Sequence, residues 1–257
     1  MKVSIVTISF NQAEFLEKAI LSVLSQGYGD LEYIIVDPGS DDGSRDIIEK
    51  YRSEITEIIY ESDDGPADGL NKGFSRATGE VFGFLNADDV LLPGAVERAI
   101  SCFEKESVDL VSFNGYEIDE NEKKRRKLVS NNFDIEAYVY GMCVLVQQST
   151  FFTREAFLNV NGFNSSNRIS WDGELWLDMA KKGFRFKKFP GYISGFRIYN
   201  TSITGSGDFV EQGLSVLKRH RRELGFDREI GRIKKLSLWL KVRMLDLDFW
   251  LVKIGVR

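Results

Sequence analysis

Acidic residues follow two apolar segments that are typical of buried strands. Asp37 comes directly after residues 33–36, and the sequence Asn-Ala-Asp-Asp at 86–89 comes directly after residues 81–85. In open α/β sheets, ligands bind beyond the carboxyl ends of the strands. Carboxylates there can accept hydrogen bonds from a nucleotide base and can bind Mg²⁺ or Mn²⁺. The pattern therefore predicts a site for a nucleotide and a divalent cation.

Both acidic segments also have a purely structural explanation. The glycine-rich loop at 37–44 suits a tight turn, and Asp88 or Asp89 suits an acidic cap for a helix beginning near Pro93. No G-x-G-x-x-G follows a strand, and no G-x-x-x-x-G-K-[ST] is present. Bound phosphates would therefore need a metal or helix N-termini to neutralise them.

Strand-like and helix-like segments alternate through the first half of the chain. The expected strands span residues 3–9, 33–36, 55–60, 81–85 and 108–114. This alternation predicts an α/β fold with a mostly parallel central sheet flanked by helices. The second half is less regular, with a charged turn at 121–127, helices near 154–160 and 173–182, and a loop around 197–207.

The charge is divided unevenly along the 257 residues. The whole chain carries −5, but residues 218–257 hold twelve Lys/Arg against five Asp/Glu. The acidic body disfavours nucleic acid as a partner, while residues 208–257 are expected to form a basic amphipathic helical tail. Its mixture of Trp, Leu and Lys/Arg suits peripheral contact with an anionic membrane, or equally packing on protein.

Two cysteines, Cys102 and Cys143, lack metal-like spacing, which favours a reducing compartment and buried thiols. Neither an apolar leader nor a run of about 20 apolar residues is present. We therefore expect a cytoplasmic protein, with the tail bringing it to the inner face of the membrane.

Four segments, in order, resemble the family 2 glycosyltransferases. They are TISFNQAEFLEKAILSVLSQ, YIIVDPGSDDGSRDII, ESDDGPADGLNKGFSRATGEVFGFLNADD and WDGELWLDMAKKG. The resemblance covers about residues 1–205 and is nearest the bacterial members that build exopolysaccharide or lipopolysaccharide. It implies a GT-A fold, a nucleotide-diphospho-sugar donor such as a UDP-sugar, Mn²⁺ or Mg²⁺, and transfer with inversion to a glycan or lipid-linked acceptor.

The resemblance also assigns the donor pocket. Ser9, Phe10 and Asp37 would line the nucleoside site, and Asn71 would help hold the donor. Residues 86–88 occupy the family's D-x-D position, which makes Asp88 the metal ligand. Asp89 would contact the sugar or support the metal ligand. Asn86 departs from the motif, because its amide can bind a ribose hydroxyl but adds no charge.

Asp172 matches the position of the family's catalytic base. An inverting transfer needs one carboxylate to take the proton of the acceptor hydroxyl. Asp172 could instead cap the next helix, and Glu174 could be a first-turn acid favoured by the helix dipole. With the resemblance, Asp172 is the expected base and Glu174 the reserve.

The segment at 197–202 matches a loop near the diphosphate in many relatives. Arg197 is the expected diphosphate contact, and Tyr199 stands where relatives carry a histidine. The only histidine in the sequence, His220, is expected to be a solvated helix residue.

Two domains are therefore expected, a GT-A domain at 1–207 and the tail at 208–257. Within the GT-A domain, residues 1–114 would bind the nucleotide-sugar and residues 115–207 the acceptor. The alternative from another class is a non-catalytic sugar-nucleotide binding or scaffolding subunit. A nucleotidyltransferase is a third possibility, but residues 9–12 do not form its usual triphosphate loop.

Overall fold

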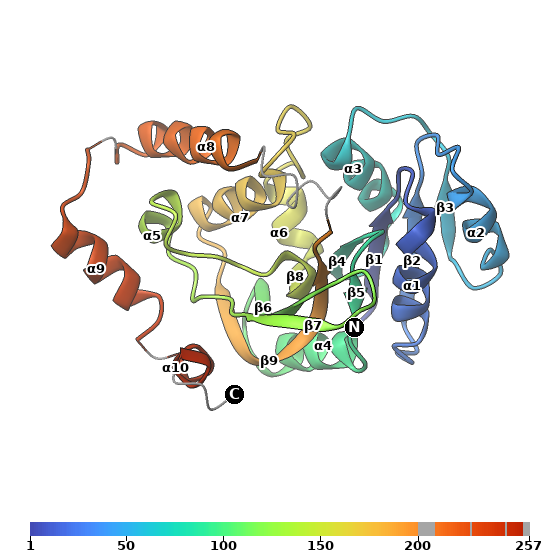
Figure 1. The fold of residues 1–257 in the computed structure, drawn as a ribbon, viewed down its shortest axis with the longest axis horizontal. Coiled ribbons are helices and arrows are strands. Elements are labelled where there is room, and N and C mark those ends of the chain that lie inside the picture. Colours follow the sequence, from blue (N-terminus) through green and yellow to red (C-terminus); the bar gives the residue numbers. More distant parts are fainter. Residues whose placement is uncertain (200–208, 227, 245, 254–257) are drawn as a thin grey trace.

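A single mixed sheet organises the computed structural model, which describes residues 1–199, 209–226, 228–244 and 246–253 (Figure 1). The strands in this part of the chain are β1 Val3–Ile8, β2 Leu31–Val36, β3 Glu57–Ile59, β4 Val81–Asn86, β5 Val90–Leu91, β6 Leu110–Ile118, β7 Lys124–Leu128, β8 Thr150–Thr153 and β9 Phe186–Arg197. Their order is β3-β2-β1-β4-β8-β6-β9-β5, with β7 paired to β6.

The α-helices of the described residues lie between and after these strands. They are α1 Ala13–Leu24, α2 Ser44–Lys50, α3 Pro66–Arg76, α4 Ala95–Lys105, α5 Ile135–Val139, α6 Arg154–Asn159, α7 Trp171–Lys181, α8 Phe209–Glu223, α9 Arg232–Lys241 and α10 Leu247–Lys253. Apolar residues of α1, α2 and α4 cover one face of the sheet, and those of α3, α6 and α7 cover the other. Such double coverage explains why β1, β2 and β4 are nearly continuous apolar runs.

The register of the parallel strands aligns their carboxyl ends. Ile8, the last residue of β1, lies opposite Val36 in β2 and Asn86 in β4. Neighbouring strands in a sheet are about 4.8 Å apart. The segments that follow β1, β2 and β4 therefore meet at one edge of the sheet, as expected from the sequence.

The second half of the sheet contains four strands that were not predicted from the sequence, β5, β7, β8 and β9. The charged turn expected at 121–127 is confirmed only in part, because a turn does connect β6 to β7, but residues 124–127 belong to β7, which pairs antiparallel with β6. Lys and Arg are not typical strand formers, so cross-strand pairing decides this element. The short β8 separates β4 from β6, and β9 contains Pro190 and two glycines, which mask a strand in sequence.

The described residues of the tail form three helices, of which α8 lies next to α5 and α7 while α9 and α10 lie at the side of the molecule (Figure 1). Leu238 and Val242 are buried with Ala137 and Cys143, so one side of α9 packs on α5. Both cysteines are free thiols, Cys143 buried and Cys102 partly buried. In the described part of the chain, no helix has both the length and the apolar character that crossing a bilayer requires. The expected boundary at 207/208 and most of the 197–207 loop lie outside the described residues.

Candidate active site

Asp37 lies beyond the carboxyl end of β2 with its carboxylate fully buried. Its Oδ1 accepts hydrogen bonds from the backbone N–H of Gly39 at 3.1 Å and Ser40 at 2.9 Å, and from Arg45 Nε at 3.0 Å. Its Oδ2 is buried and accepts no hydrogen bond from any described residue. A buried acceptor without a donor is costly, and an N–H group of a nucleotide base could satisfy it.

Ser9 and Phe10 continue from β1 beside Asp37. The Ser9 N–H donates to the carbonyl of Val36 at 2.9 Å, which extends the strand ladder by one residue. Its Oγ is also buried without a partner among the described residues. Phe10 is 60% exposed. An exposed ring next to two unsatisfied polar atoms suits a planar base, which could stack on the ring and bind these atoms.

The loop at 37–44 also fixes the start of α1. Asp42 Oδ2 accepts a hydrogen bond from the backbone N–H of Ala13 at 2.8 Å, and Ser40 Oγ accepts one from that of Asn11 at 2.9 Å. The Asn11 backbone adopts a φ of 52°, and the carboxylate of Asp42, from the neighbouring loop, caps the start of α1. The loops after β1 and β2 therefore hold each other in place.

Asp89 lies in the cluster of residues that follows β4, and its carboxylate makes hydrogen bonds inside the protein. It is fully buried, and its Oδ1 accepts a hydrogen bond from the Arg197 N–H at 2.8 Å. Its Oδ2 accepts one from Gln148 Nε2 at 2.7 Å and one from Asn86 Nδ2 at 3.3 Å. Burial and the neighbouring Asp88 charge raise the pKa of Asp89 well above its usual value. Of the two roles expected for Asp89, this geometry suits support and not sugar contact.

Asp88 is half-buried and lies at the open side of the same cluster. The Tyr199 hydroxyl is 3.1 Å from Asp88 Oδ2 and 3.1 Å from Gln12 Oε1. Burial raises the pKa of Asp88, while the Tyr199 hydrogen bond and the Arg197 charge partly oppose this effect. Burial and the Asp88 charge raise the pKa of Tyr199 to about 12, so this phenol stays neutral and can donate to the carboxylate.

Arg197 is buried and its guanidinium is directed into the protein. Its Nε donates to the carbonyl of Asp88 at 2.7 Å, and its Nη1 donates to the carbonyls of Asp119 at 2.8 Å and Glu120 at 3.1 Å. The guanidinium carbon also lies 4.7 Å from the centre of the Phe15 ring. In place of the diphosphate contact expected from the sequence, Arg197 ties the backbone of Asp88 to the β6–β7 hairpin.

Asp172 is the second residue of α7, in the first turn of this helix. The side chain is half-buried, and no other side chain of the described residues donates a hydrogen bond to it. Burial raises its pKa, and backbone N–H groups of its own turn partly oppose that rise. Trp171, directly before it, packs its ring 5.3 Å from that of Phe84, which brings the start of α7 to the carboxyl half of β4.

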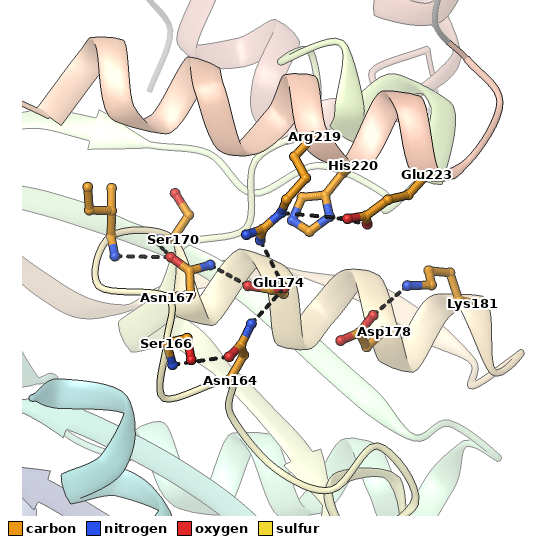
Figure 2. Close-up of polar contacts among 11 residues, drawn as sticks. Asn164, Ser166, Asn167, Ser170, Glu174, Asp178, Lys181, Arg219, His220 and Glu223 are labelled. Carbon is orange, nitrogen blue, oxygen red and sulfur yellow. Dashed lines mark hydrogen bonds and ion pairs between the residues drawn. The ribbon is translucent and has the colours of Figure 1, made fainter. Parts of the chain in front are cut away.

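Glu174 and Asn71 are both occupied by contacts within the protein. Glu174 is 9% exposed and is surrounded by Asn164, Asn167 and Arg219 (Figure 2). Asn71 Nδ2 donates to the carbonyl of Phe163 at 2.8 Å, and its Oδ1 accepts a hydrogen bond from the Phe163 N–H at 2.9 Å. Neither side chain is presented to a donor sugar in this arrangement.

A bound divalent cation fits this site only if the substrate completes its coordination. The described residues contain no group of three His, Cys, Asp or Glu side chains placed to hold a metal. Asp88 offers one half-buried carboxylate with an oxygen beside Tyr199. Mg²⁺ is commonly held by one or two carboxylates together with substrate phosphates and water. The residues therefore fit a cation shared with a diphosphate.

Several residues that shape the site were not predicted from the sequence. Arg45 pairs with Asp37, Gln148 binds Asp89, and Gln12 lies with Tyr199 beside Asp88. The only signal for Arg45 was its place in the loop segment of Asp37. The glutamines carried no signal, because they come from distant parts of the chain and their residue type is common.

A sheet whose parallel half is covered by helices on both faces, with carboxylates just beyond the ends of its strands, has the α/β architecture of the GT-A type. Solved structures support this fold. TarS 1–349 of S. aureus in complex with UDP-GlcNAc has a TM-score of 0.68 and 14% identity, covering 94% of this chain and 71% of that one. The mannosyltransferase PcManGT of Pyrobaculum calidifontis, in complex with GDP-Man and Mn²⁺, has a TM-score of 0.68 and 17% identity, covering 99% and 73%.

Sequence comparison assigns the family. The model of glycosyl transferase family 2 matches residues 4–204, so the chain belongs to this family. The putative teichuronic acid biosynthesis glycosyltransferase TuaG of Bacillus subtilis is 30% identical over 79% of this chain and 82% of that protein.

Other relatives match over smaller parts of their length. The GalNAc(5)-diNAcBac-PP-undecaprenol beta-1,3-glucosyltransferase of Campylobacter jejuni is 26% identical over 82% of this chain and 55% of that protein. An uncharacterized glycosyltransferase of Nostoc is 39% identical over 48% of this chain and 39% of that protein. The chain thus spans well under two thirds of the length of some relatives.

Proposed function

We propose that this chain transfers a sugar from a nucleoside-diphosphate sugar to a hydroxyl group of a glycan or lipid-linked acceptor in surface polysaccharide synthesis, with inversion at the anomeric carbon. The observation that carries the proposal is a set of incompletely satisfied carboxylates, Asp37 and Asp88 just beyond the ends of β2 and β4 and Asp172 in the first turn of α7. Asp37 keeps a buried oxygen without a donor among the described residues, Asp88 receives one side-chain hydrogen bond, from Tyr199, and Asp172 receives none from a described side chain. Their positions suit a base, a diphosphate and an acceptor hydroxyl respectively.

The donor end of the site is built to bind a base. Asp37 Oδ2 and Ser9 Oγ are the buried polar atoms left for its polar edge, and Phe10 is the ring exposed beside them. A uracil offers one N–H donor and carbonyl acceptors, which match a carboxylate and a hydroxyl. A UDP-sugar is therefore the first donor to test. The UDP-GlcNAc bound to TarS supports this choice by analogy.

Asp88 is the residue that would hold Mn²⁺ or Mg²⁺. When bound, the cation would neutralise the diphosphate and stabilise it as a leaving group. The Mn²⁺ complex of the similar PcManGT supports a metal by analogy. Tyr199 would keep the Asp88 carboxylate oriented through its hydroxyl. Asn86 adds no charge, so Asp88 would supply the negative charge of the protein at this position.

Asp172 would act as the general base. Its raised pKa makes it a better proton acceptor than an exposed aspartate, and it has no competing side-chain donor among the described residues. The acceptor oxygen would bond to the anomeric carbon as the bond from that carbon to the diphosphate breaks. Its proton would pass to Asp172, and attack from the face opposite the leaving group inverts the centre.

The exposed surface of α9 suggests that the protein acts at a membrane. On α9, Ile233 is 88% and Leu236 57% exposed, and Met244 just after the helix is 66% exposed. Basic residues flank this surface, and Arg232 and Lys235 form no ion pair with another described residue. Exposed apolar side chains flanked by cations suit an anionic bilayer. The undecaprenol-linked acceptor named for the C. jejuni relative supports a lipid-linked acceptor by analogy.

The transfer is tested by donor hydrolysis and transfer over a panel of nucleotide sugars, with and without Mn²⁺, followed by NMR of the product's anomeric configuration. The proposal expects one preferred donor, stimulation by Mn²⁺ and an inverted product. Saturable donor binding without turnover for any donor and acceptor pair would instead support the scaffolding alternative. A retained configuration would contradict the role of Asp172.

Membrane contact has a separate test. The full chain should sediment with vesicles containing phosphatidylglycerol and not with pure phosphatidylcholine vesicles. Replacing Ile233 and Leu236 by Asp should abolish sedimentation, whereas Leu158→Asp, at an exposed leucine on α6, should not. Equal sedimentation of the α9 double variant and the wild-type chain would remove this surface as the contact.

A further inference from the structure

Glu174 on α7 is the centre of a polar cluster that joins three parts of the chain (Figure 2). Its Oε1 accepts a hydrogen bond from Asn164 Nδ2 at 3.1 Å and one from Arg219 Nη2 at 3.0 Å. Its Oε2 accepts a hydrogen bond from Asn167 Nδ2. A carboxylate has about four acceptor positions, so most of its capacity is used.

The two asparagines bind Glu174 with one end of their amide group and their own loop with the other. Asn164 Oδ1 accepts a hydrogen bond from the Ser166 N–H at 3.1 Å. Asn167 Oδ1 accepts hydrogen bonds from the N–H groups of Ile169 and Ser170, both at 3.1 Å. Each amide therefore links Glu174 to the backbone of residues 164–170.

The same loop is anchored at its beginning by α3. Asn71 makes two hydrogen bonds with the backbone of Phe163, and its Nδ2 lies 3.3 Å from Ser165 Oγ. The loop ends at Ser170, and α7 begins at Trp171, with Asp172 next. The first turn of α7 is thus reached through a segment that is held at both ends.

The third part of the cluster comes from the tail. Arg219 on α8 reaches Glu174 from 45 positions along the chain, and it also lies 3.7 Å from Glu223. The next residue, His220, is 1% exposed and lies 3.3 Å from Glu223 through Nδ1. The expectation that His220 is solvated is wrong, because α8 turns this side toward the body of the protein. Arg219 itself is 46% exposed, so water partly screens its charge.

We infer that Glu174 is a positioning residue that orients Asp172 through the 164–170 loop. Arg219, through its contact with Glu174, makes α8 contribute to this positioning. This inference rests on the proposed function, in which Asp172 takes the acceptor proton. Glu174 is poorly suited to take that proton itself, because its donors would have to be displaced or reoriented. Charge-assisted hydrogen bonds of this kind fix geometry strongly.

The test compares four variants with the full-length wild-type chain: Glu174→Gln, Asn167→Ala, Arg219→Gln and Lys218→Gln. Lys218 is an exposed neighbour on α8 and serves as the matched control. Misplacing a catalytic group slightly can lower turnover by roughly 100-fold. We expect Glu174→Gln and Asn167→Ala to lower kcat by about 10- to 100-fold, and Arg219→Gln by a smaller factor. Donor affinity and the control should be unchanged.

Two further readouts separate positioning from proton transfer. The acid limb of the kcat profile should persist in Glu174→Gln, because Asp172 still takes the proton. Amide hydrogen exchange of residues 165–170 should accelerate in Arg219→Gln, which changes a half-exposed side chain and is expected to fold. Loss of the acid limb in Glu174→Gln, or wild-type turnover in Asn167→Ala, would overturn the inference.

The failure of this inference can be told from the failure of the proposed function. If Asp172→Asn is inactive and binds donor normally while Asn167→Ala and Arg219→Gln turn over at the wild-type rate, the proposed function stands and the positioning role is wrong. If Asp172→Asn retains full transfer, the proposed function itself fails.

Discussion

Strand β2 has a buried carboxylate at each end, Glu32 at its start and Asp37 just after its last residue. Glu32 accepts hydrogen bonds from Ser4 Oγ at 2.5 Å, Lys2 Nζ at 2.9 Å, and both the N–H and the hydroxyl of Thr78, at 2.7 and 2.8 Å. Asp37 keeps one buried oxygen without a donor among the described residues.

The two ends of the sheet therefore use acids for different purposes. Burial opposes ionisation of Glu32, but the hydrogen bonds from Ser4, Thr78 and Lys2 outweigh it and lower the pKa to about 2. Burial raises the pKa values of Asp88 and Asp172, and their few internal donors do not compensate. Satisfied acids hold the fold together, whereas in the proposed function the incompletely satisfied ones bind and react with substrate.

Among the substitutions of the incompletely satisfied acids at the carboxyl end of the sheet, Asp88→Ala should have the largest effect on transfer. It removes the carboxylate that would hold the cation, so we expect transfer to fall by at least about 100-fold. Stimulation of donor binding by Mn²⁺, measured by calorimetry, should also disappear. Asp178→Asn, an exposed pair with Lys181 on α7, is the matched control and should behave like wild type. Donor binding that still responds to Mn²⁺ would remove Asp88 as the ligand.

The dependence of transfer on pH should reflect the raised pKa values of the incompletely satisfied acids. Asp88 and Asp172 must be ionised to work, and their raised pKa values mean that protonation begins above the 3.8 of an ordinary aspartate. The acid limb of kcat/KM should accordingly lie above that value, with circular dichroism verifying that the protein stays folded. An acid limb at or below 3.8 would show that neither group limits the reaction.

Asp37→Asn should weaken the nucleoside end specifically. A hydrogen bond to a charged group contributes about 1.5–3 kcal/mol, which corresponds to roughly a 10- to 100-fold rise in the donor KM. The kcat at saturating donor should change little, because Asp37 does not touch the reacting atoms in this account. Competition assays with UDP against other nucleoside diphosphates should also show reduced selectivity. An unchanged KM would mean that the base binds elsewhere.

Glu32→Gln should affect stability and leave the chemistry intact. Removing the charge from four hydrogen bonds should lower the free energy of unfolding at pH 7 by about 1.5–3 kcal/mol in urea titrations. The lowered pKa means that the wild-type contribution is present above the ordinary value of 4.5 and is lost as pH falls toward about 2. The variant should lack this part of the acid destabilisation. A large loss of kcat in the folded variant would contradict the claim that Glu32 serves stability and not the reaction.

The carboxyl edge of the sheet could be predicted because it depends on local patterns. Asp37 and the residues at 86–89 each follow an apolar strand, and parallel register brings such ends together. The roles of Arg197 and Glu174 could not be predicted, because their partners are distant in sequence. Arg197 binds carbonyls 77 and 78 positions away, and Glu174 binds Arg219 on a tail helix. Nothing in the residue types alone distinguishes an available charge from one that is already neutralised.

The second half of the sheet was harder to predict for a related reason. Strands β7 and β9 contain basic residues, proline and glycine, so pairing with β6 determines them more than local preference does. The long β9 carries Arg197 at its end, and Tyr199 beside Asp88 follows from that placement.

Asp172→Asn provides the most direct test of the central claim that an incompletely satisfied carboxylate on α7 takes the acceptor proton. The substitution keeps the size of the side chain and removes its basicity. Donor affinity and transfer should be measured on the same preparation, with the Tm recorded. We expect normal donor affinity, an unchanged or higher Tm because a half-buried charge is lost, and a fall in transfer of about 10²- to 10⁴-fold. Transfer at the wild-type rate would contradict the account.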